Sequence, residues 1–512
     1  MFAGWLRLRD VGPAPAHRGR QRLRGAGAAL IAIVVAGACG TATATPTPSV
    51  GPTATPWPAL PATFTPWPSP TVEPTQAPTE GPTPFTTQAP GSDFALALGR
   101  AGLLAPAADS GSLAGTEIND FGLDLLRRLD PTGNLCASPT SIALALAMVR
   151  PGARGLTATE MDKVLYNFGS TGQAAEIVAL ILALQSQTVY DDSGWSSNDP
   201  QATPNHTGQQ PIAELDVSNA AFAQKGMSLQ QAYLDSLSSG FGAGLGLLDY
   251  RNNPEGARQI INKWASDRTK GRIPAVLSPG DIDSMTRIAL ANAIYLKAAW
   301  VTPFDPSATK SLPFTRGDGS AVSVPTMAAE RTLSYSAGSG YRAVVLPMGS
   351  GGLSMTIVVP DSMASFVTGL TAARLAAIDG AAQKYDVDLT LPRFTVMSRF
   401  DLAATLAAMG MPALFDPNAA DLSGITTVEQ LYIAKVIHQA NIDVVEQGTT
   451  ASAVTVAVGR ATSAGPGATP PHVQFHVNKP FLYFIREEST GAMLFMGRID
   501  DPSARSSGPT NQ

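Results

Sequence analysis

The sequence predicts one large mixed α+β domain that follows an export signal and an extended linker. Three observations support this organisation: an apolar run near the N-terminus ends at a cysteine, a stretch dominated by Thr, Pro and Ala comes next, and from about Phe94 onward helical and strand patterns alternate without an internal repeat. With 512 residues, 44% of them hydrophobic, the chain is long enough to bury a core of domain size.

Charge and cysteine content narrow the class of protein. The formal net charge of -5 is small for this length, and Lys and Arg form no block outside the N-terminus, so we expect no nucleic-acid partner. Two cysteines, Cys39 and Cys136, are too few for a disulfide framework. We expect Cys136 to be a small buried hydrophobic residue, with redox sensing as the alternative. Stability must therefore come from a core.

Residues 1–39 have the features of a signal peptide. Arg18, Arg20, Arg22 and Arg24 precede an apolar run at residues 26–38, which is short for a membrane span. The run ends in Ala-Gly-Ala-Cys-Gly, which resembles the bacterial lipobox, and this resemblance implies a lipoprotein-like form in which Cys39 is lipidated and becomes the new N-terminus. Plain cleavage near residue 38, which would release a free secreted protein, is the alternative.

Residues 40–93 predict a disordered tether. They are rich in Thr, Pro and Ala, a composition that cannot bury enough apolar surface to fold. A polyproline II chain extends by about 3.1 Å per residue, so about fifty residues would hold the domain on the order of 100 Å or more from a membrane. We therefore expect a secreted protein that is tethered to the cell surface through a lipid anchor at Cys39. After the domain, residues 504–512 predict a disordered tail.

The first part of the domain, which we expect to span residues 94–503, is mainly helical. Apolar residues recur at helical spacing between residues 119 and 129, and Ser138-Pro139 begins a second helix in which residues 142–148 are apolar on almost every side. That second helix should be central. Thr157 and Glu160 have the spacing of a capping box and predict the start of a third helix. The polar residues 190–211 predict an inserted surface loop.

The second part of the domain alternates strands and helices. Strand patterns occur at residues 287–296, 344–359, 386–391 and 433–446. Near the end, residues 481–485 and 493–499 flank a Glu-Glu-Ser-Thr-Gly stretch and predict a hairpin of two buried strands.

Five segments, in order along the chain, resemble the serpin family of serine-protease inhibitors. They are residues 134–142; residues 262–264 with 269–274; residues 292–297 with Trp300 and Phe304; residues 438–448 with 449–455; and residues 478–486 with 494–498. The resemblance covers most of residues 115–503. It implies the serpin fold, with three β-sheets, about eight or nine helices and an exposed reactive loop at about residues 448–471.

Residues 449–459 have the sequence of a β-strand although they fall in this loop. They contain no Pro and no charged residue and are rich in Val, Thr and Ala. With a period of two, one face would carry Thr449, Ala451, Ala453, Thr455 and Ala457, which are small enough for a closely packed interior. Residues 464–471 contain three prolines and cannot continue the strand. Residues 449–459 are therefore predicted to be able to join a β-sheet as an additional strand.

The resemblance implies a suicide-substrate mechanism in which the protease partner supplies the catalysis. A serine protease, or a cysteine protease, cuts the exposed loop and forms an acyl-enzyme, and the freed loop inserts into a β-sheet and traps the protease covalently. The chain would then not be an enzyme and would have no catalytic residue of its own. We expect no cofactor, no metal site and a monomeric protein.

The resemblance also assigns roles to individual residues. The reactive bond falls at Thr462-Ser463, and Arg460-Ala461 is the alternative that would suit a trypsin-like protease. The hinge consists of Glu446, Gly448, Thr449, Thr450, Ala451, Ser452, Ala453, Val454 and Thr455. The shutter, a polar cluster beneath the strands that part during insertion, consists of Ser138, Ser141, Asn292 and His438, and Trp300 and Phe304 pack behind the sheet. The alternative for His438 is a purely structural role, as a buried histidine whose hydrogen bonds are made within the core.

Two other functions compete with protease inhibition. An enzyme is disfavoured because the sequence contains neither a Gly-x-Ser-x-Gly nor a His-Glu-x-x-His motif, and His472 and His476 have only the spacing of weak metal ligands. A non-inhibitory serpin-fold binding protein on the cell surface is the stronger alternative. In such proteins the hinge usually contains bulky, charged or Pro residues, which residues 449–455 lack, although Gln447, Thr450 and Val454 depart from the family pattern.

Overall fold

The computed structural model describes residues 94–108, 111–170, 172–187, 213–449, 470–504 and 506–507. The chain divides into two units, residues 1–78 and 79–512, and every described residue belongs to the second. The predicted signal peptide with Cys39, the predicted tether at residues 40–93 and the predicted loop at residues 190–211 lie outside the described residues. So do hinge residues 450–455 and both candidate reactive bonds, Thr462-Ser463 and Arg460-Ala461.

The predicted α+β class is confirmed, and the described residues contain nine α-helices, within the expected number. They are α1 (Ser112–Leu126), α2 (Pro139–Val149), α3 (Gly155–Val164), α4 (Ala174–Gln185), α5 (Gln231–Phe241), α6 (Pro254–Arg268), α7 (Met363–Thr368), α8 (Ala372–Gly380) and α9 (Ala403–Met409).

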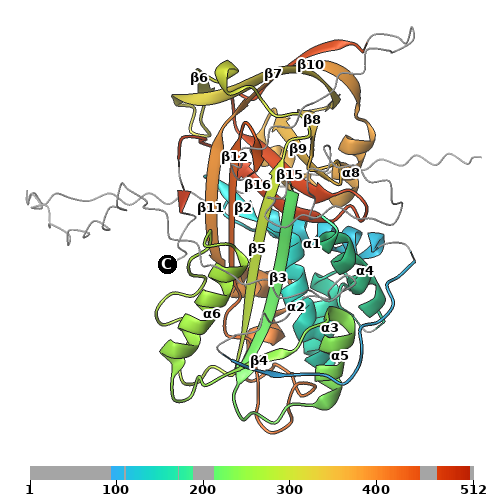
Figure 1. Ribbon diagram of the computed structural model, residues 1–512, viewed down its shortest axis with the longest axis vertical. Helices are drawn as coiled ribbons and strands as arrows, with labels where there is room; N and C mark the ends of the chain where they lie inside the picture. The colour runs from blue at the N-terminus through green and yellow to red at the C-terminus, as the bar shows by residue number, and fades with distance from the viewer. Residues whose placement is uncertain are drawn as a thin grey trace, which may run out of the picture. The chain divides into compact units, whose positions relative to one another are not determined.

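One β-sheet has eight strands and contains Gly448 and Thr449 of the predicted hinge. In spatial order they are β1 (Ala95–Ala97), β4 (Leu245–Leu248), β3 (Ala213–Gln224), β5 (Ile288–Ala299), β13 (Gly448–Thr449), β12 (Ile437–Val445), β11 (Phe394–Asp401) and β17 (Ser506–Ser507). Figure 1 shows β11, β12, β5 and β3 running through the middle of the folded domain. The two residues of β13 therefore stand between two much longer strands.

The second sheet has nine strands. In spatial order they are β14 (His472–His476), β10 (Gln383–Pro392), β7 (Ala321–Gly338), β8 (Tyr341–Met348), β9 (Leu353–Pro360), β15 (Phe481–Glu487), β16 (Met493–Ile499) and β2 (Leu135–Ala137), with β6 (Lys310–Thr315) paired to β7. The resemblance implied three sheets, whereas the described residues form two hydrogen-bonded sheets. The reason is β7, whose residues 321–335 pair with β6 and β10 while residues 334–338 continue into a ladder with β8.

α2 is the predicted central helix. The Ser138 hydroxyl caps it by accepting a hydrogen bond from the Ser141 N–H at 3.2 Å, and Pro139 occupies the first turn, where an N–H has no intrahelical partner. All of its residues are buried. A helix that is apolar on every side is stable only when other elements surround it, which explains its place behind the eight-stranded sheet.

α3 begins differently from the prediction. Arg154 is its N-cap residue and makes no side-chain capping bond. The Thr157 hydroxyl instead accepts a hydrogen bond from the Asp421 N–H at 2.9 Å, and the Glu160 carboxylate accepts one from the Ala413 N–H at 2.8 Å. The capping-box prediction is wrong because tertiary partners take both side chains.

The C-terminal tail is also partly different from the prediction. Within residues 504–512, which were expected to be disordered, Ser506 and Ser507 form β17 and pair in parallel with Val396 and Met397 of β11. This short strand covers the edge of the eight-stranded sheet, where unpaired backbone groups would otherwise be exposed.

The eight-stranded sheet separates two hydrophobic clusters. On one face α2 packs against β3 and β5, and Ile294 and Leu296 of β5 belong to the main core. On the other face Ile261 of α6 shares a second cluster with Ala291 of β5 and Ile437 of β12. Because successive side chains of a strand point to opposite faces, β5 contributes to both clusters.

Candidate functional site

The site begins where β12 turns into β13. In this hairpin Val445 pairs with Gly448 and Val444 pairs with Thr449. On its other side β13 pairs with β5, antiparallel, through Ala298 and Ala299. The first two residues of the predicted reactive loop therefore already form a strand between β5 and β12.

Gly448 is required by the local geometry. Its φ is +138°, and a Cβ atom at this position would lie 2.1 Å from the carbonyl oxygen of Ala298. A side chain would therefore clash with the backbone of β5, in a conformation that residues other than glycine rarely adopt. The predicted hinge glycine is thus explained by close approach of two backbones.

Thr449 is buried, with 1% of its surface exposed. Its hydroxyl donates to the Ala298 carbonyl at 3.3 Å and accepts from the Ala298 N–H at 3.1 Å. Since residues directly opposite each other in a ladder share a face, Thr449 lies on the same side as Val444 and Ala298, both members of the main core. This is the closely packed face that the alternation of small residues predicted for Thr449.

Glu446, the first predicted hinge residue, is buried in the turn of the hairpin. Arg393 donates from Nε to its carboxylate at 2.7 Å and forms an ion pair with it, and the Thr309 hydroxyl donates to the same oxygen. Burial alone would raise the pKa of Glu446, but these hydrogen bonds and the Arg393 charge outweigh it and hold the pKa below its usual range. The base of the loop is therefore fixed by an ionised carboxylate.

Trp300 does more than the predicted packing behind the sheet. Its indole Nε1–H donates to the Val445 carbonyl at 2.9 Å, and its backbone N–H donates to the Gln447 carbonyl at 2.9 Å. Phe304 donates its backbone N–H to the Glu446 carbonyl at 2.9 Å, and its ring meets that of Trp300 edge to face at a centroid distance of 6.1 Å. Both aromatic residues thus bind the turn from which the reactive loop begins.

The structure brings three of the four predicted shutter residues into one hydrogen-bonded chain. The Ser138 N–H lies 3.0 Å from His438 Nε2, and His438 Nδ1 lies 3.1 Å from Asn292 Oδ1. Because Nε2 must accept, the proton of the neutral ring is on Nδ1 and is donated to Asn292. Asn292 continues the chain through Nδ2 to Asn219 Oδ1 at 3.2 Å. The fourth residue, Ser141, lies beside them, but its buried hydroxyl makes no hydrogen bond with the described residues.

His438 is uncharged at physiological pH. Only 1% of its surface is exposed, and burial lowers its pKa to about 3. The bond between His438 of β12 and Asn292 of β5 is thus a neutral side-chain bridge between two strands that β13 separates at their other end.

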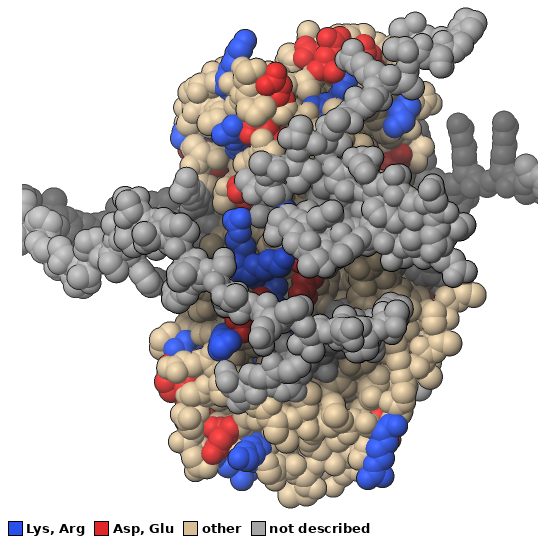
Figure 2. Space-filling model, in the orientation of Figure 1, with Lys and Arg blue, Asp and Glu red and all other residues tan. Residues whose placement is uncertain are grey.

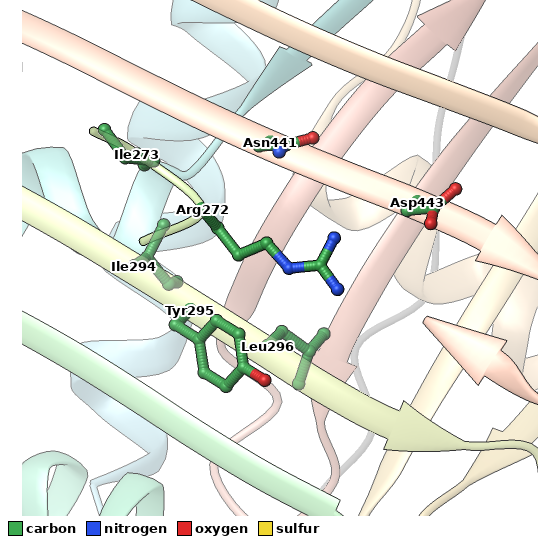
Figure 3. A pocket seen from close by; sticks show the side chains of 7 residues that line it. All are labelled: Arg272, Ile273, Ile294, Tyr295, Leu296, Asn441 and Asp443. Carbon is green, nitrogen blue, oxygen red and sulfur yellow. The ribbon is translucent and has the colours of Figure 1, made fainter. Parts of the chain in front are cut away.

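A small cavity lies between β13 and this bridge. Ile294, Tyr295 and Leu296 of β5 line one side, and Asn441 and Asp443 of β12 line the other. Figure 3 shows the Arg272 side chain extending between the two strands, with its guanidinium group toward Asp443. The Asn441 Oδ1 atom is buried there and makes no hydrogen bond with the described residues. The gap between β5 and β12 therefore contains unfilled space and an unpaired polar group.

Sequence reasoning missed several residues that build this site. Arg393 and Thr309 are distant in sequence from Glu446, and no local pattern indicates their contact. Asn219 lies opposite Asn292 in the ladder between β3 and β5, so only a prediction of strand register would have identified it. Arg272 follows α6 in a segment whose path across the sheet depends on the tertiary fold.

The described residues contain no helix that is both long and apolar enough to cross a membrane. Among the same residues, no group of three or more His, Cys, Asp or Glu side chains is arranged to hold a metal ion. His472 and His476 of β14 instead face Glu330 and Asp388, at 3.9 Å and 3.4 Å. Cys136 is buried, and burial raises the pKa of its thiol to about 12.

Comparison with known proteins decides the family. The family model described as "Serpin (serine protease inhibitor)" matches residues 116–502. The chain belongs to the serpin family. The family description names serine-protease inhibitors, and the fold and family implied by the five segments are confirmed.

Relatives of this serpin include leukocyte elastase inhibitors from several vertebrates. The protein of Xenopus tropicalis is 32% identical over 394 residues, which cover 75% of this chain and 97% of the relative. The human protein is 31% identical over 400 residues, and that of Sus scrofa is 34% identical over 401 residues, with the same shares of both chains.

Solved structures support the same fold. A tumour-suppressing serpin has a TM-score of 0.65 at 21% identity, over 77% of this chain and 100% of the other. The thermophilic serpin tengpin in its native state has a TM-score of 0.62 at 24% identity, over 79% and 97%. Thyroxine-binding globulin in complex with thyroxine has a TM-score of 0.62 at 26% identity, over 77% and 100%.

Proposed function

We propose that this serpin is a serine-type protease inhibitor that acts as a suicide substrate. A protease cuts the loop after residue 449, and the freed segment then inserts as a strand between β5 and β12 while the protease is still attached as an acyl-enzyme. The observation that carries this proposal is β13: Gly448 and Thr449 already occupy the first two positions of such a strand.

The register of β13 predicts where the following residues would go. If both ladders continue, Ala451 would lie between Leu296 and Ile442, and Ala453 would lie between Ile294 and Ala440. These four neighbours belong to the main core, and Val444 and Ala298, the neighbours of Thr449, belong to it as well. The small side chains at every second position of the loop would therefore lie on the face of the sheet that packs against the main core, where there is least room.

The same register gives the shutter residues their proposed role. Thr455 would lie between Asn292 and His438, which are now hydrogen-bonded to each other at 3.1 Å. A strand that enters this far must break that bond and offer the two buried side chains new partners. We therefore propose that the His438–Asn292 hydrogen bond holds β5 and β12 together at the end of the gap farthest from β13 until the loop is cut.

The expected free energy of insertion is large. Roughly ten new ladder hydrogen bonds at about 1 kcal/mol each, together with apolar burial, would contribute on the order of 10 kcal/mol or more. This equals the whole stability of many domains, which is about 5–15 kcal/mol. The intact form would then persist because its conversion is slow, and not because it is the most stable form.

A panel of elastase-like, subtilisin-like and trypsin-like proteases tests the proposal. An inhibitor forms a covalent adduct that survives boiling in detergent, and mass spectrometry of the released fragment identifies the cut bond. We expect cleavage at Thr462-Ser463, with Arg460-Ala461 as the alternative for trypsin-like enzymes. If every protease in the panel yields only fragments, the inhibitory mechanism is refuted.

A non-inhibitory binding protein is the second candidate. It is favoured by the fold similarity to thyroxine-binding globulin, whose solved structure is a complex with thyroxine. Inhibitor and binding protein differ in one simple result, because a binding protein would be cut in the loop without retaining the protease. The leukocyte elastase inhibitors among the relatives favour inhibition.

We also propose that the inhibitor is monomeric and that lipidation of Cys39 tethers it to the cell surface, as the lipobox-like sequence suggests. Metabolic labelling with a radioactive fatty acid tests the anchor. Label should enter the wild type and not Cys39→Ser, which should appear in the culture medium. Equal release of both proteins into the medium would contradict the anchor.

A further inference from the structure

The segment at residues 269–286, which joins α6 to β5, crosses the gap between β5 and β12. Its residues Arg272 and Ile273 line the cavity together with side chains of both strands. Farther along, Val276 and Ile282 belong to the hydrophobic cluster that also contains Ala291 of β5 and Ile437 of β12. We call residues 269–286 the crossing segment. It covers the face of the gap opposite α2. On the face of the molecule displayed in Figure 2, Lys and Arg side chains gather near the middle, with acidic side chains beside them.

At its beginning the crossing segment is bound to the strands on the β5 side of the gap. Lys270 forms an ion pair with Glu214 of β3, and its ammonium group lies 5.4 Å from the ring centroid of Tyr295 of β5. The Asn262 side chain of α6 accepts hydrogen bonds from the Val276 and Leu277 N–H groups at 2.9 Å and 2.8 Å. The beginning of the crossing segment is therefore bound to α6, β3 and β5.

Farther along, at Asp281, the crossing segment is bound to the strands on the β12 side of the gap. Asp281 Oδ2 lies 2.6 Å from the Arg399 guanidinium of β11, and Asp281 Oδ1 lies 2.7 Å from Lys435 Nζ, two residues before β12. The Ser278 N–H also donates to Asp281 Oδ2 at 2.7 Å. Asp281 thus connects the crossing segment to both β11 and the start of β12.

Asp281 is ionised and largely withdrawn from solvent. Its side chain is only 10% exposed, against 35% for Arg399 and 41% for Lys435. Burial alone would raise its pKa, but the hydrogen bonds from Lys435 and the Ser278 N–H and the nearby positive charges outweigh it and lower the pKa. A carboxylate that is withdrawn from solvent loses stability when its partners move away, so these contacts oppose movement of the strands.

We propose that Asp281 is a positioning residue that limits the rate at which a strand enters the gap. This inference rests on the proposed function. Neighbouring strands lie about 4.8 Å apart, so a new strand requires β5 and β12 to separate by about that distance. The crossing segment is bound to strands on the β5 side and on the β12 side of the gap, so it cannot keep both sets of contacts when the two sides separate. Since its Lys270 end is held together with α6 and its other end continues into β5, the contacts of Asp281 with Arg399 and Lys435 must break when the strands separate.

A synthetic peptide with the sequence of residues 449–459 tests this without a protease. Added to the intact protein, it should enter the gap slowly, and the fraction of protein that resists heating measures the rate. Asp281→Asn keeps the side-chain shape and removes the charge, and we expect it to raise the rate roughly fivefold, which is the effect of about 1 kcal/mol on a barrier. Lys435→Met, which removes one partner instead, should raise the rate in the same direction and serves if Asp281→Asn does not fold.

Two control variants and a salt test separate this role from general stabilisation. Asp162→Asn removes a carboxylate that pairs with Arg150 at 2.5 Å and 2.6 Å in α3, away from the gap, and should leave the rate unchanged. Asp281→Glu retains the charge and should restore most of the wild-type rate. High salt should accelerate entry into the wild type and have little effect on Asp281→Asn.

The outcomes distinguish this inference from the function on which it rests. Equal peptide-entry rates for wild type, Asp281→Asn and Lys435→Met would overturn the role of Asp281 even if cleavage of the loop makes the protein more heat-resistant. If the cleaved wild type gains no heat resistance, the proposed function fails, and the role of Asp281 fails with it.

Discussion

The strongest single-residue prediction concerns Gly448, the residue at the start of the inserted strand. Gly448→Ala places a Cβ atom 2.1 Å from the Ala298 carbonyl oxygen in a residue with φ of +138°. The backbone conformation alone costs about 1–3 kcal/mol for a residue other than glycine. The clash adds the loss of β13, whose few hydrogen bonds are worth about 1 kcal/mol each. We expect a total of roughly 2–5 kcal/mol.

This cost falls on the step that begins insertion, because further residues can join the sheet only if β13 is in place. Since about 1.4 kcal/mol corresponds to a factor of ten, we expect the ratio of trapped to merely cleaved inhibitor to fall at least about tenfold. Densitometry of detergent-resistant adduct against cleaved product measures this ratio. Gly340→Ala is a matched control, because Gly340 has φ of +83° and no heavy atom near the added carbon. Equal adduct yields for the two variants would refute the steric argument.

Three further predictions concern Thr449, the pH dependence due to His438 and to Glu117 of α1, and Trp300. Thr449→Arg places a charge at a position that is 1% exposed and should turn the inhibitor into a substrate; an unchanged adduct yield on a detergent gel would contradict the assigned face. Burial holds the pKa of His438 near 3 against an ordinary 6.5, so the folded state binds fewer protons between these values, and acidification through that window should cost about 1.4 kcal/mol per pH unit. Burial raises the pKa of Glu117 from 4.5 to about 7, so this residue should make the folded state more stable as the pH falls between these values. Urea unfolding at a series of pH values measures the free energy of unfolding of His438→Gln and Glu117→Gln. Relative to wild type, the two variants should change its slope against pH in opposite directions. Trp300→Phe leaves the Val445 carbonyl without its indole donor and should lower the stability of the intact protein by about 1–3 kcal/mol in chemical denaturation, whereas an unchanged midpoint would show that the bond contributes little.

Local signals predicted those elements whose cause is local. Ser138-Pro139 identified the start of α2 because a capping hydroxyl and a first-turn proline act within one turn of helix. The alternation of small residues after Gly448 identified the face of Thr449 because strand geometry has a period of two. The opposite case is Thr157, whose spacing to Glu160 matched a capping box although both side chains bind other parts of the fold.

Features that depend on contacts between distant parts of the chain could not be predicted from the sequence. The ion pair between Arg393 and Glu446 joins residues on different elements, and nothing near either residue indicates the other. The continuity of β7 through both parts of its sheet, which reduces three expected sheets to two, is also a consequence of strand pairing. The contacts of Asp281 with Arg399 and Lys435 likewise join residues that are more than 100 positions apart in the sequence.

The most direct test of the whole account is the heat stability of the protein before and after its loop is cut. A metalloprotease, which forms no acyl-enzyme, can cut the loop without being trapped, and differential scanning calorimetry then compares the two forms. We predict that the cut protein unfolds at a much higher temperature than the intact one, because the freed strand fills the gap between β5 and β12. If the cut protein unfolds at the same or a lower temperature, no strand has entered the sheet and the proposed mechanism is contradicted.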